Sequence, residues 1–228
     1  ALLTDNDHLR SDLIRSYAVP DASAEKIVRI WTPANGKPRE ASLAAQRLSW
    51  STQQRPMILW AGRLDRQKRF DLVVEIARLM PDVDFRCWGV AVLDDGPVKA
   101  QLPANVQLNG SFRSVEDLPL EQADGWLYTS GWDGLPTILI ELAMLGMPIV
   151  ASAVGGVPEL IDAETGWPVD GAAGTEAYVA AIRELIDKPD ERLRRGEALQ
   201  SRAKQRHTER SFDHALAPLL SESGRRSG

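Results

Sequence analysis

Short apolar runs alternate with segments of helical character along most of this chain, and this alternation limits the fold more than any other feature. Six runs are predicted to be strands, at residues 57–61, 83–89, 105–109, 125–129, 148–152 and 166–169. Helices are predicted between or after them, at residues 70–80, 115–122, 136–145, 175–187 and 190–206. Strands joined through helices pair in parallel by right-handed crossovers. The pattern therefore predicts an α/β fold with a doubly wound, Rossmann-like parallel sheet.

The first 55 residues have a different character. A helix is predicted at residues 7–17 and a strand at residues 26–31. Residues 32–55 are polar and contain Pro and Gly, which is typical of a linker with at most one helical turn. The alternation of strands and helices begins only after this segment, so a boundary is expected near residue 55.

Composition excludes several classes of function. The 228 residues carry 27 Lys and Arg against 32 Asp and Glu, a net charge of −5, so no cationic excess is present for a nucleic-acid backbone. Cys87 is the single cysteine, which rules out an internal disulfide and a cysteine-based zinc site and favours a reducing, cytoplasmic location. The longest uncharged stretch, residues 142–158, is interrupted by Gly and Pro and is not expected to span a membrane.

Ligands of parallel sheets bind where strands end and helices begin, so these loops are the places to look for chemistry. The loop after the first of the six strands contains Gly62, Arg63 and Lys68 and leads into a helix. An arginine fork, a lysine charge and a helix N-terminus together favour phosphate binding. Because Arg66 and Arg69 lie in the same loop, the alternative is a basic loop that is simply solvated.

The loop after the fourth strand also leads into a helix, and that helix contains Glu141. This is the single charged residue between Gly134 and Pro158. A lone carboxylate in an apolar helix is costly to bury unless a ligand engages it, and a carboxylate can accept from both hydroxyls of a ribose. The amides of Thr137 and Ile138 would then face the phosphates of the same ligand. The alternative is that Glu141 occupies the one solvent-facing edge of the helix.

Four motifs follow one another along residues 57–186. They are Gly62-Arg63-Leu64 with Lys68, Ser130-Gly131-Trp132-Asp133-Gly134-Leu135-Pro136 continuing to Glu141, residues 151–159 (ASAVGGVPE), and Thr165-Gly166-Trp167. In this order and spacing they resemble the group 1 (family 4) retaining glycosyltransferases of the GT-B class. That family is built from two Rossmann-like domains, and this chain is similar to the C-terminal one, which holds the nucleotide-sugar donor.

The resemblance implies roles for individual residues. Arg63 and Lys68 would neutralise the donor diphosphate and, with Asp133, form the catalytic set. Asp133 and Glu141 match the family's pair of acids, of which the first faces the donor sugar and the second holds the ribose. Asp133 is one methylene shorter than the family's Glu. The donor-binding residues implied are Gly62, Phe112, Arg113, Gly134, Leu135, Thr137, Ile138 and Glu141, with Phe112 and Arg113 near the nucleobase. No metal or other cofactor is expected.

The resemblance also implies a division of the chain. Residues 1–55 would be the remnant of an N-terminal domain and the crossover, residues 56–210 the donor-binding domain, and residues 211–228 a C-terminal tail. The implied activity is hexosyl or similar transfer from a nucleoside-diphosphate sugar to an acceptor hydroxyl in glycan, glycolipid or polysaccharide synthesis. The acceptor, a glycan or lipid-linked glycan, would bind a missing N-terminal domain, without which the chain is expected to be inactive. The full-length protein is expected in the cytoplasm, peripheral at the inner membrane face.

Two other functions are compatible with an α/β chain of this kind. One is a sugar-nucleotide epimerase of the GT-B fold, which the Gly-Leu-Pro motif at residues 134–136 followed by Glu141 disfavours. The other is a non-catalytic nucleotide-binding module. The sequence also predicts that His207 and His214 lie on the surface of terminal helices and that Cys87 is a small core residue. It leaves Trp132 open between lining the donor site and packing.

Overall fold

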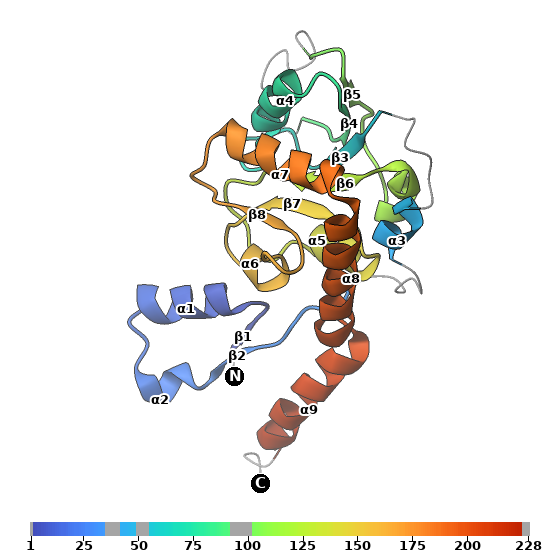
Figure 1. Ribbon diagram of the computed structural model, residues 1–228. Coiled ribbons are helices and arrows are strands. Elements are labelled where there is room, and N and C mark those ends of the chain that lie inside the picture. The colour runs from blue at the N-terminus through green and yellow to red at the C-terminus, as the bar shows by residue number, and fades with distance from the viewer. Residues whose placement is uncertain (1, 35–41, 49–54, 92–101, 225–228) are drawn as a thin grey trace.

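The computed structural model describes residues 2–34, 42–48, 55–91 and 102–224. A six-stranded sheet forms its centre, with helices on both faces (Figure 1). Its strands are β3 (Met57–Ala61), β4 (Asp84–Trp88), β5 (Val106–Leu108), β6 (Gly125–Tyr128), β7 (Ile149–Ser152) and β8 (Trp167–Val169). Every neighbouring pair is parallel, and the order across the sheet is β5-β4-β3-β6-β7-β8. The predicted doubly wound parallel sheet is confirmed.

The strand order places a switch point between β3 and β6. From β3 the chain builds outward through β4 to β5, then returns to β6 and builds outward in the other direction to β8. The loops that leave β3 and β6 therefore diverge to opposite faces and open a crevice at the carboxyl ends of these two strands. All five residues of β3 are buried, as a central strand requires, and the apolar run of residues 57–61 reflects this.

Each face of the sheet has its own core. On one face, α4 (Phe70–Leu79) and α7 (Thr175–Asp187) cover side chains such as Ile58, Phe85 and Val150. On the other face, α3 (Leu43–Leu48), α5 (Thr137–Met144) and α8 (Pro189–Arg206) cover side chains such as Leu59 and Trp126. The 3-10 turns η2 (Val115–Asp117) and η3 (Leu120–Gln122) and the short helix α6 (Val157–Leu160) complete this second face. Cys87 is fully buried, as predicted.

The start of α5 differs from the prediction in one respect. Pro136 was expected at the first helical position but is the N-cap, with an extended backbone (φ −64°, ψ 133°), so the helix begins at Thr137. Gly146 ends the helix as predicted, with a positive φ of +67°. The N-cap proline supplies no side-chain hydrogen bond to the first turn.

A small unit precedes the sheet. The strands β1 (Leu2–Thr4) and β2 (Ile27–Arg29) pair in parallel and are joined by α1 (Asp7–Ser16) and α2 (Asp21–Ala24). Figure 1 shows this unit beside α6 and below the main sheet, with α9 (Glu209–Gly224) extending away from the end of α8. Among the residues described, none of the helices combines the length and apolar character that crossing a bilayer requires.

Candidate functional site

The loops that leave β3 and β6 meet at the switch point of the sheet. Thr129 Oγ donates to the carbonyl of Lys68 at 2.7 Å, and Gly131 N donates to the carbonyl of Gln67 at 2.8 Å. Gln67 Nε2 donates in turn to the carbonyl of Trp132 at 3.0 Å. These bonds join the two loops edge to edge, so the first and second sequence motifs form one site.

Lys68 and Asp133 form an ion pair at the centre of this site. Lys68 Nζ lies 2.5 Å from Asp133 Oδ2, and each side chain is 19% exposed. Tyr128 Oη, at the end of β6, donates to the same carboxylate oxygen at 2.5 Å. Gly134 N donates to the other oxygen, Oδ1, at 3.1 Å. The carboxylate thus has donors on both oxygens, and the lysine charge is compensated in the absence of a ligand.

The surroundings of Asp133 favour its ionised form. Burial raises the pKa of Asp133, but the hydrogen bonds from Lys68 and Tyr128 outweigh burial, and the net effect lowers the pKa. Burial, followed by the hydrogen bond to Asp133, raises the pKa of Tyr128. At neutral pH the site therefore presents an ionised Asp133 and a neutral Tyr128 beside the lysine, an arrangement that can exchange partners with an incoming anion.

Arg63 lies on the outer side of the same loop. Its guanidinium donates to Gln67 Oε1 at 2.7 Å and lies 3.0 Å from Asp65 Oδ2, and its side chain is 53% exposed. It is therefore available to a ligand if these local partners are exchanged. Gly62 lies beneath Lys68, since a Cβ built on it would be 3.2 Å from Lys68 Cγ. A side chain at this position would push against the lysine stem.

A pocket of about 430 Å³ lies beside the start of α5. It is lined by Phe112, Arg113, Ser114, Val115, Glu116, Thr137, Ile138 and Glu141. Five of these eight residues are candidates from the sequence, contributed by two segments that are distant in the chain: the loop after β5 and the first two turns of α5. Glu141 is half-buried and lines this pocket.

Two further donor-binding candidates, Leu135 and Gly134, contribute through packing and backbone position. The side chain of Leu135 is 6% exposed and packs in the core beneath the loop, so it fixes the backbone rather than presenting a polar group. Gly134 lies at the rim, where a Cβ would be 3.8 Å from Asn6 Nδ2. Trp132 is 59% exposed, so it does not pack in the core of the described residues. The roles of all these residues toward a ligand remain predictions.

Sequence reasoning missed several residues of the site. Tyr128 falls in the predicted strand at residues 125–129 and receives no role from the sequence, although a hydroxyl at the end of a buried strand is itself a signal. Gln67 was overlooked between two charged neighbours. Ser114 and Glu116 line the pocket, and the hydrogen bond from Ser114 lowers the pKa of Glu116. Polar residues of this kind carry no periodic pattern, so only the fold brings them to the site.

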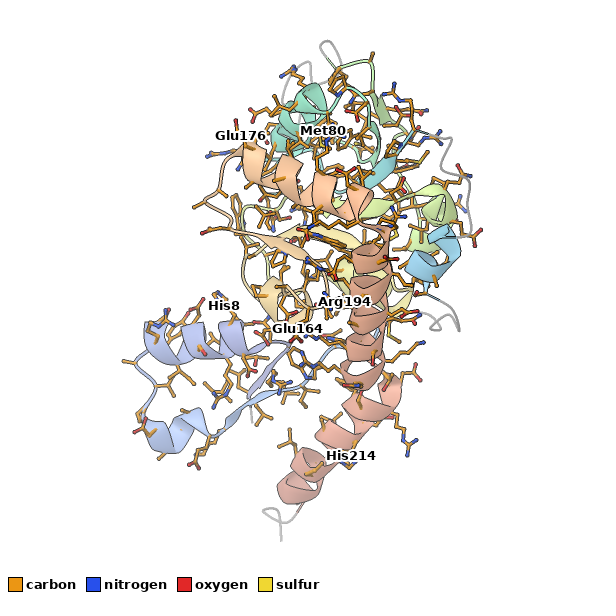
Figure 2. All side chains as sticks on the ribbon, viewed as in Figure 1. His8, Met80, Glu164, Glu176, Arg194 and His214 are labelled. Atoms are coloured by element: carbon orange, nitrogen blue, oxygen red, sulfur yellow. The ribbon has the colours of Figure 1, made fainter. Side chains whose placement is uncertain are left out.

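The histidines are not part of the site, and one prediction about them is wrong. His207 is 1% exposed instead of lying on the surface. Its Nδ1 donates to the carbonyl of Thr32 at 2.8 Å, and its ring meets Trp31 edge-on at 5.4 Å between centroids. Burial lowers its pKa. His8 and His214 are exposed, and Figure 2 shows them on two separate helices, α1 and α9.

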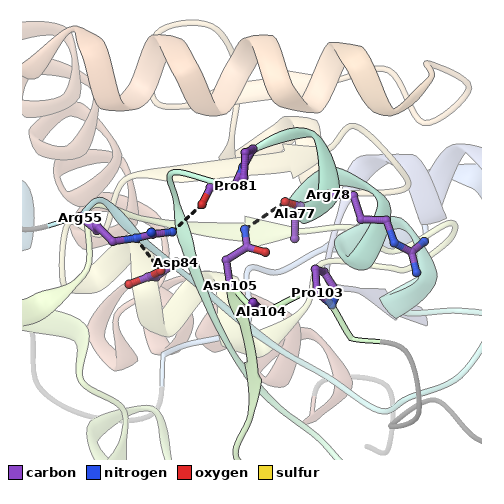
Figure 3. A pocket seen from close by; sticks show the side chains of 8 residues that line it. All are labelled: Arg55, Ala77, Arg78, Pro81, Asp84, Pro103, Ala104 and Asn105. Carbon is purple, nitrogen blue, oxygen red and sulfur yellow. Dashed lines mark hydrogen bonds and ion pairs between the residues drawn. The ribbon is translucent and has the colours of Figure 1, made fainter.

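A second pocket, of about 420 Å³, lies at the opposite end of the strands, near the starts of β3, β4 and β5 and the end of α4 (Figure 3). Arg55 lies 3.0 Å from Asp84 Oδ1 and donates to the carbonyl of Pro81 at 2.6 Å. Asn105 Nδ2 donates to three carbonyls at the end of α4 and in the turn after it. The polar groups of Arg55 and Asn105 are thus engaged by the fold. In the described part of the chain, His, Cys, Asp and Glu side chains nowhere gather in a group of three suited to a metal ion.

Comparisons with known proteins identify the family of the chain. A family model described as glycosyl transferases group 1 matches residues 55–188. The chain is 30% identical to alpha-maltose-1-phosphate synthase of Mycolicibacterium smegmatis, covering 83% of this chain and 54% of that protein. It is 26% identical to alpha-D-kanosaminyltransferase of Streptomyces kanamyceticus, covering 86% and 54%. The chain thus spans about half the length of the curated relatives it matches.

Solved structures share the fold at lower identity. The sucrose-phosphate synthase of Thermosynechococcus elongatus superposes with a TM-score of 0.78 at 18% identity, covering 98% of this chain and 58% of that chain. Anabaena HepE in complex with UDP gives a TM-score of 0.78 at 17% identity, covering 96% and 63%.

Proposed function

Because the chain belongs to the glycosyl transferases group 1 family, with the GT-B-like fold of its structural neighbours, we propose that it is the donor-binding half of a retaining glycosyltransferase. The complete enzyme would transfer a hexose or similar sugar from a nucleoside diphosphate to an acceptor hydroxyl. The acceptor is a glycan or lipid-linked glycan, held by a further domain. With Cys87 as the single cysteine, we place the reaction in the cytoplasm, at the inner membrane face when the acceptor carries a lipid.

This proposal is supported by the position of the site. The Lys68–Asp133 pair and the pocket beside α5 both lie on loops that a nucleotide sugar would contact at once. Within the described residues, the N-cap Pro136 gives the first turn of α5 no side-chain hydrogen bond, so the amides of Thr137 and Ile138 are positioned to bind an anion. The diphosphate would lie between these amides and Lys68, and Arg63 would reach it from the loop after β3. The ribose would reach Glu141.

The reaction then follows from the charges. The bond between the anomeric carbon and the diphosphate oxygen breaks, and its electron pair leaves on the phosphate. Lys68, Arg63 and the start of α5 stabilise that developing charge. The acceptor oxygen bonds to the anomeric carbon from the same face, and its proton passes to the departing phosphate oxygen. Asp133 faces the sugar, and no protein nucleophile is required. The proposal includes no metal or other cofactor.

Nucleotide binding by the full 228-residue chain tests the proposal, with UDP, GDP and ADP as probes in calorimetry. Arg63→Ala should weaken binding by about 1.5–3 kcal/mol, the value of a charged hydrogen bond. Arg66→Ala, in the same loop, is the matched control. If the loop is merely solvated, the two variants will bind alike and the phosphate site is wrong.

Two assays separate the proposal from its rivals. Incubation of the chain with UDP-glucose should give neither transfer nor epimerisation at ordinary enzyme rates, because the acceptor domain and closure are absent. Appearance of an epimer would favour the epimerase. Transfer by a longer protein that contains this chain would exclude a non-catalytic module, and rapid turnover by these 228 residues alone would contradict the proposed division of labour.

A further inference from the structure

The start of helix α1 is capped by a carboxylate from far along the chain. Asp7 N donates to Glu159 Oε2 at 3.0 Å, and His8 N donates to Glu159 Oε1 at 2.9 Å. Asn6, the N-cap, accepts from Leu9 N at 2.7 Å. Helix starts leave such amides without intrahelical partners, and a carboxylate there is doubly favourable because of the helix dipole. Glu159 therefore fastens the N-terminal unit to the main domain.

Glu159 lies in α6, and the turn before this helix contacts the loop that contains Asp133 and Gly134. Gly156 N donates to the carbonyl of Gly134 at 3.0 Å. Gly155 has a positive φ of +54°, and a Cβ on it would overlap the carbonyl oxygen of Asp133, so the two backbones are in direct contact. Residues 155–159 thus contact two parts of the chain: Glu159 binds the start of α1, and Gly155 contacts the backbone of Asp133.

Asn6 closes this arrangement from the other side. It is fully buried, and a Cβ on Gly156 would be 2.8 Å from its Cγ. Its Nδ2 donates to Asp5 Oδ1 at 2.7 Å and lies 3.8 Å from the Cβ position of Gly134. Asn6 therefore fills the space between the Gly156 turn and Gly134.

We propose that Glu159 is a positioning residue: by holding the start of α1, it keeps Asn6 against the Gly156 turn and thereby fixes Asp133 toward the donor sugar. This inference rests on the proposed function, in which Asp133 faces the sugar whereas other groups hold the nucleotide. Loss of the Glu159 contact frees α1, withdraws Asn6 and loosens the backbone of Asp133. The sugar-dependent part of donor affinity falls, and the nucleotide-dependent part is retained.

The test compares the full chain with Glu159→Ala and Glu159→Gln. Glu164→Gln is the matched control, since this nearby side chain is 83% exposed and lies 3.7 Å from Arg202 (Figure 2 labels it). Calorimetry with UDP and UDP-glucose, and with GDP and GDP-mannose, measures the two parts of the affinity. Glu159→Ala should keep nucleoside-diphosphate affinity within about twofold and lose about fivefold or more for the nucleotide sugar. Glu159→Gln, with one acceptor oxygen, should fall between, and Glu164→Gln should match the parent.

Hydrogen exchange gives a readout that needs no ligand. In Glu159→Ala the amides of Asp7 and His8 should exchange about tenfold faster or more, and so should Gly134 and Gly156. Faster exchange confined to α1 would make Glu159 a structural cap only and overturn the inference, as would an equal loss of affinity for UDP and UDP-glucose. If the parent binds no nucleotide, the proposed function fails, and exchange alone decides the positioning role. Should Glu159→Ala not fold, Asn6→Ser retains a cap for Leu9 N, removes the contact with Gly156, and must lower the nucleotide-sugar affinity alone.

Discussion

Replacing Lys68 by Met should reduce stability and donor affinity together. The ammonium lies 2.5 Å from Asp133 Oδ2, and both side chains are 19% exposed. Met retains the shape of the stem but leaves the carboxylate with the Tyr128 hydroxyl and the Gly134 amide as its donors. Because these donors remain and the site is partly wet, the cost falls below the ~3–5 kcal/mol of a fully buried broken pair, at about 2 kcal/mol. For a chain of this size the Tm falls by about 4–8 °C.

The loss should depend on pH in a defined direction. Burial raises the pKa of Asp133, but the hydrogen bonds from Lys68 and Tyr128 more than offset this, so the folded-state pKa lies below the unfolded one. The stabilisation by the pair is then fully present above the unfolded carboxyl pKa of about 3.9 and is lost as the pH falls through the lowered value. The difference between Lys68→Met and the parent should be constant from about pH 5 to 8 and shrink below about pH 4.

Urea unfolding across this pH range measures the effect, and Lys188→Met is the matched control. Lys188 lies 3.4 Å from Glu184 and is 60% exposed, so its removal should cost less than about 0.5 kcal/mol. UDP affinity should fall roughly tenfold or more in Lys68→Met alone. Equal stabilities of the two variants at neutral pH, or a difference that persists undiminished at pH 3, would refute the ion-pair argument. Unchanged UDP affinity would remove Lys68 from the phosphate site.

Four further substitutions, of which Gly110→Ala is the control for Gly155→Ala, probe other parts of the structure. Glu141→Gln should weaken UDP binding by about 1 kcal/mol, roughly fivefold, with little loss for a 2′,3′-dideoxy analogue; equal losses in calorimetry would contradict a ribose role. Arg192→Met removes the cation 3.0 Å from buried Asp124 and should cost about 3–5 kcal/mol in urea unfolding, while nucleotide affinity of the folded protein stays unchanged. Gly155→Ala should destabilise by more than about 2 kcal/mol, because φ is +54° and the Cβ meets the Asp133 carbonyl. Gly110→Ala, at φ +80° in open space, should cost about 1 kcal/mol, and similar thermal melts for the two glycine variants would show that the close contact is unimportant.

The sequence predicts the central strands well because a fully buried strand appears in the sequence as a short run of mostly apolar residues. β3 (Met57–Ala61) has the predicted bounds, and β6 (Gly125–Tyr128) ends one residue before the predicted end. Elements with weaker local patterns were missed. The strand β1 (Leu2–Thr4) has three residues and exists through pairing with β2, which no periodicity announces. The sequence predicts a terminal helix around His214 without bounds, because Pro218 disfavours a continuous helix, whereas α9 (Glu209–Gly224) continues through this proline.

The site was predictable as a set of residues but not as an arrangement. Charged side chains after strands, such as Arg63 and Lys68, stand out in the sequence because such loops lead into helices. The pairing of Lys68 with Asp133 depends on β3 lying next to β6, and strand order is not encoded in any local pattern. The same holds for Glu159 and the start of α1, which are about 150 positions apart. The boundary proposed at residue 55 stays a prediction, although Leu43 and Ala44 of α3 are buried in the main domain.

The order of strands also has a consequence for how such a protein can be altered. The ion pair lies over the two central strands, whereas Phe112 and Arg113 follow β5, the outermost strand on one side. Residues 110–114 lie outside β3 and β6, but Phe112 packs against the core that contains Leu59 and Trp126, so an exchanged loop must keep an apolar residue at position 112. Under the proposed function, the residues that select the nucleobase lie at one edge of the sheet, separate from the charged groups at its centre. A library of loop grafts at these five positions would be a direct route to variants with a new donor preference.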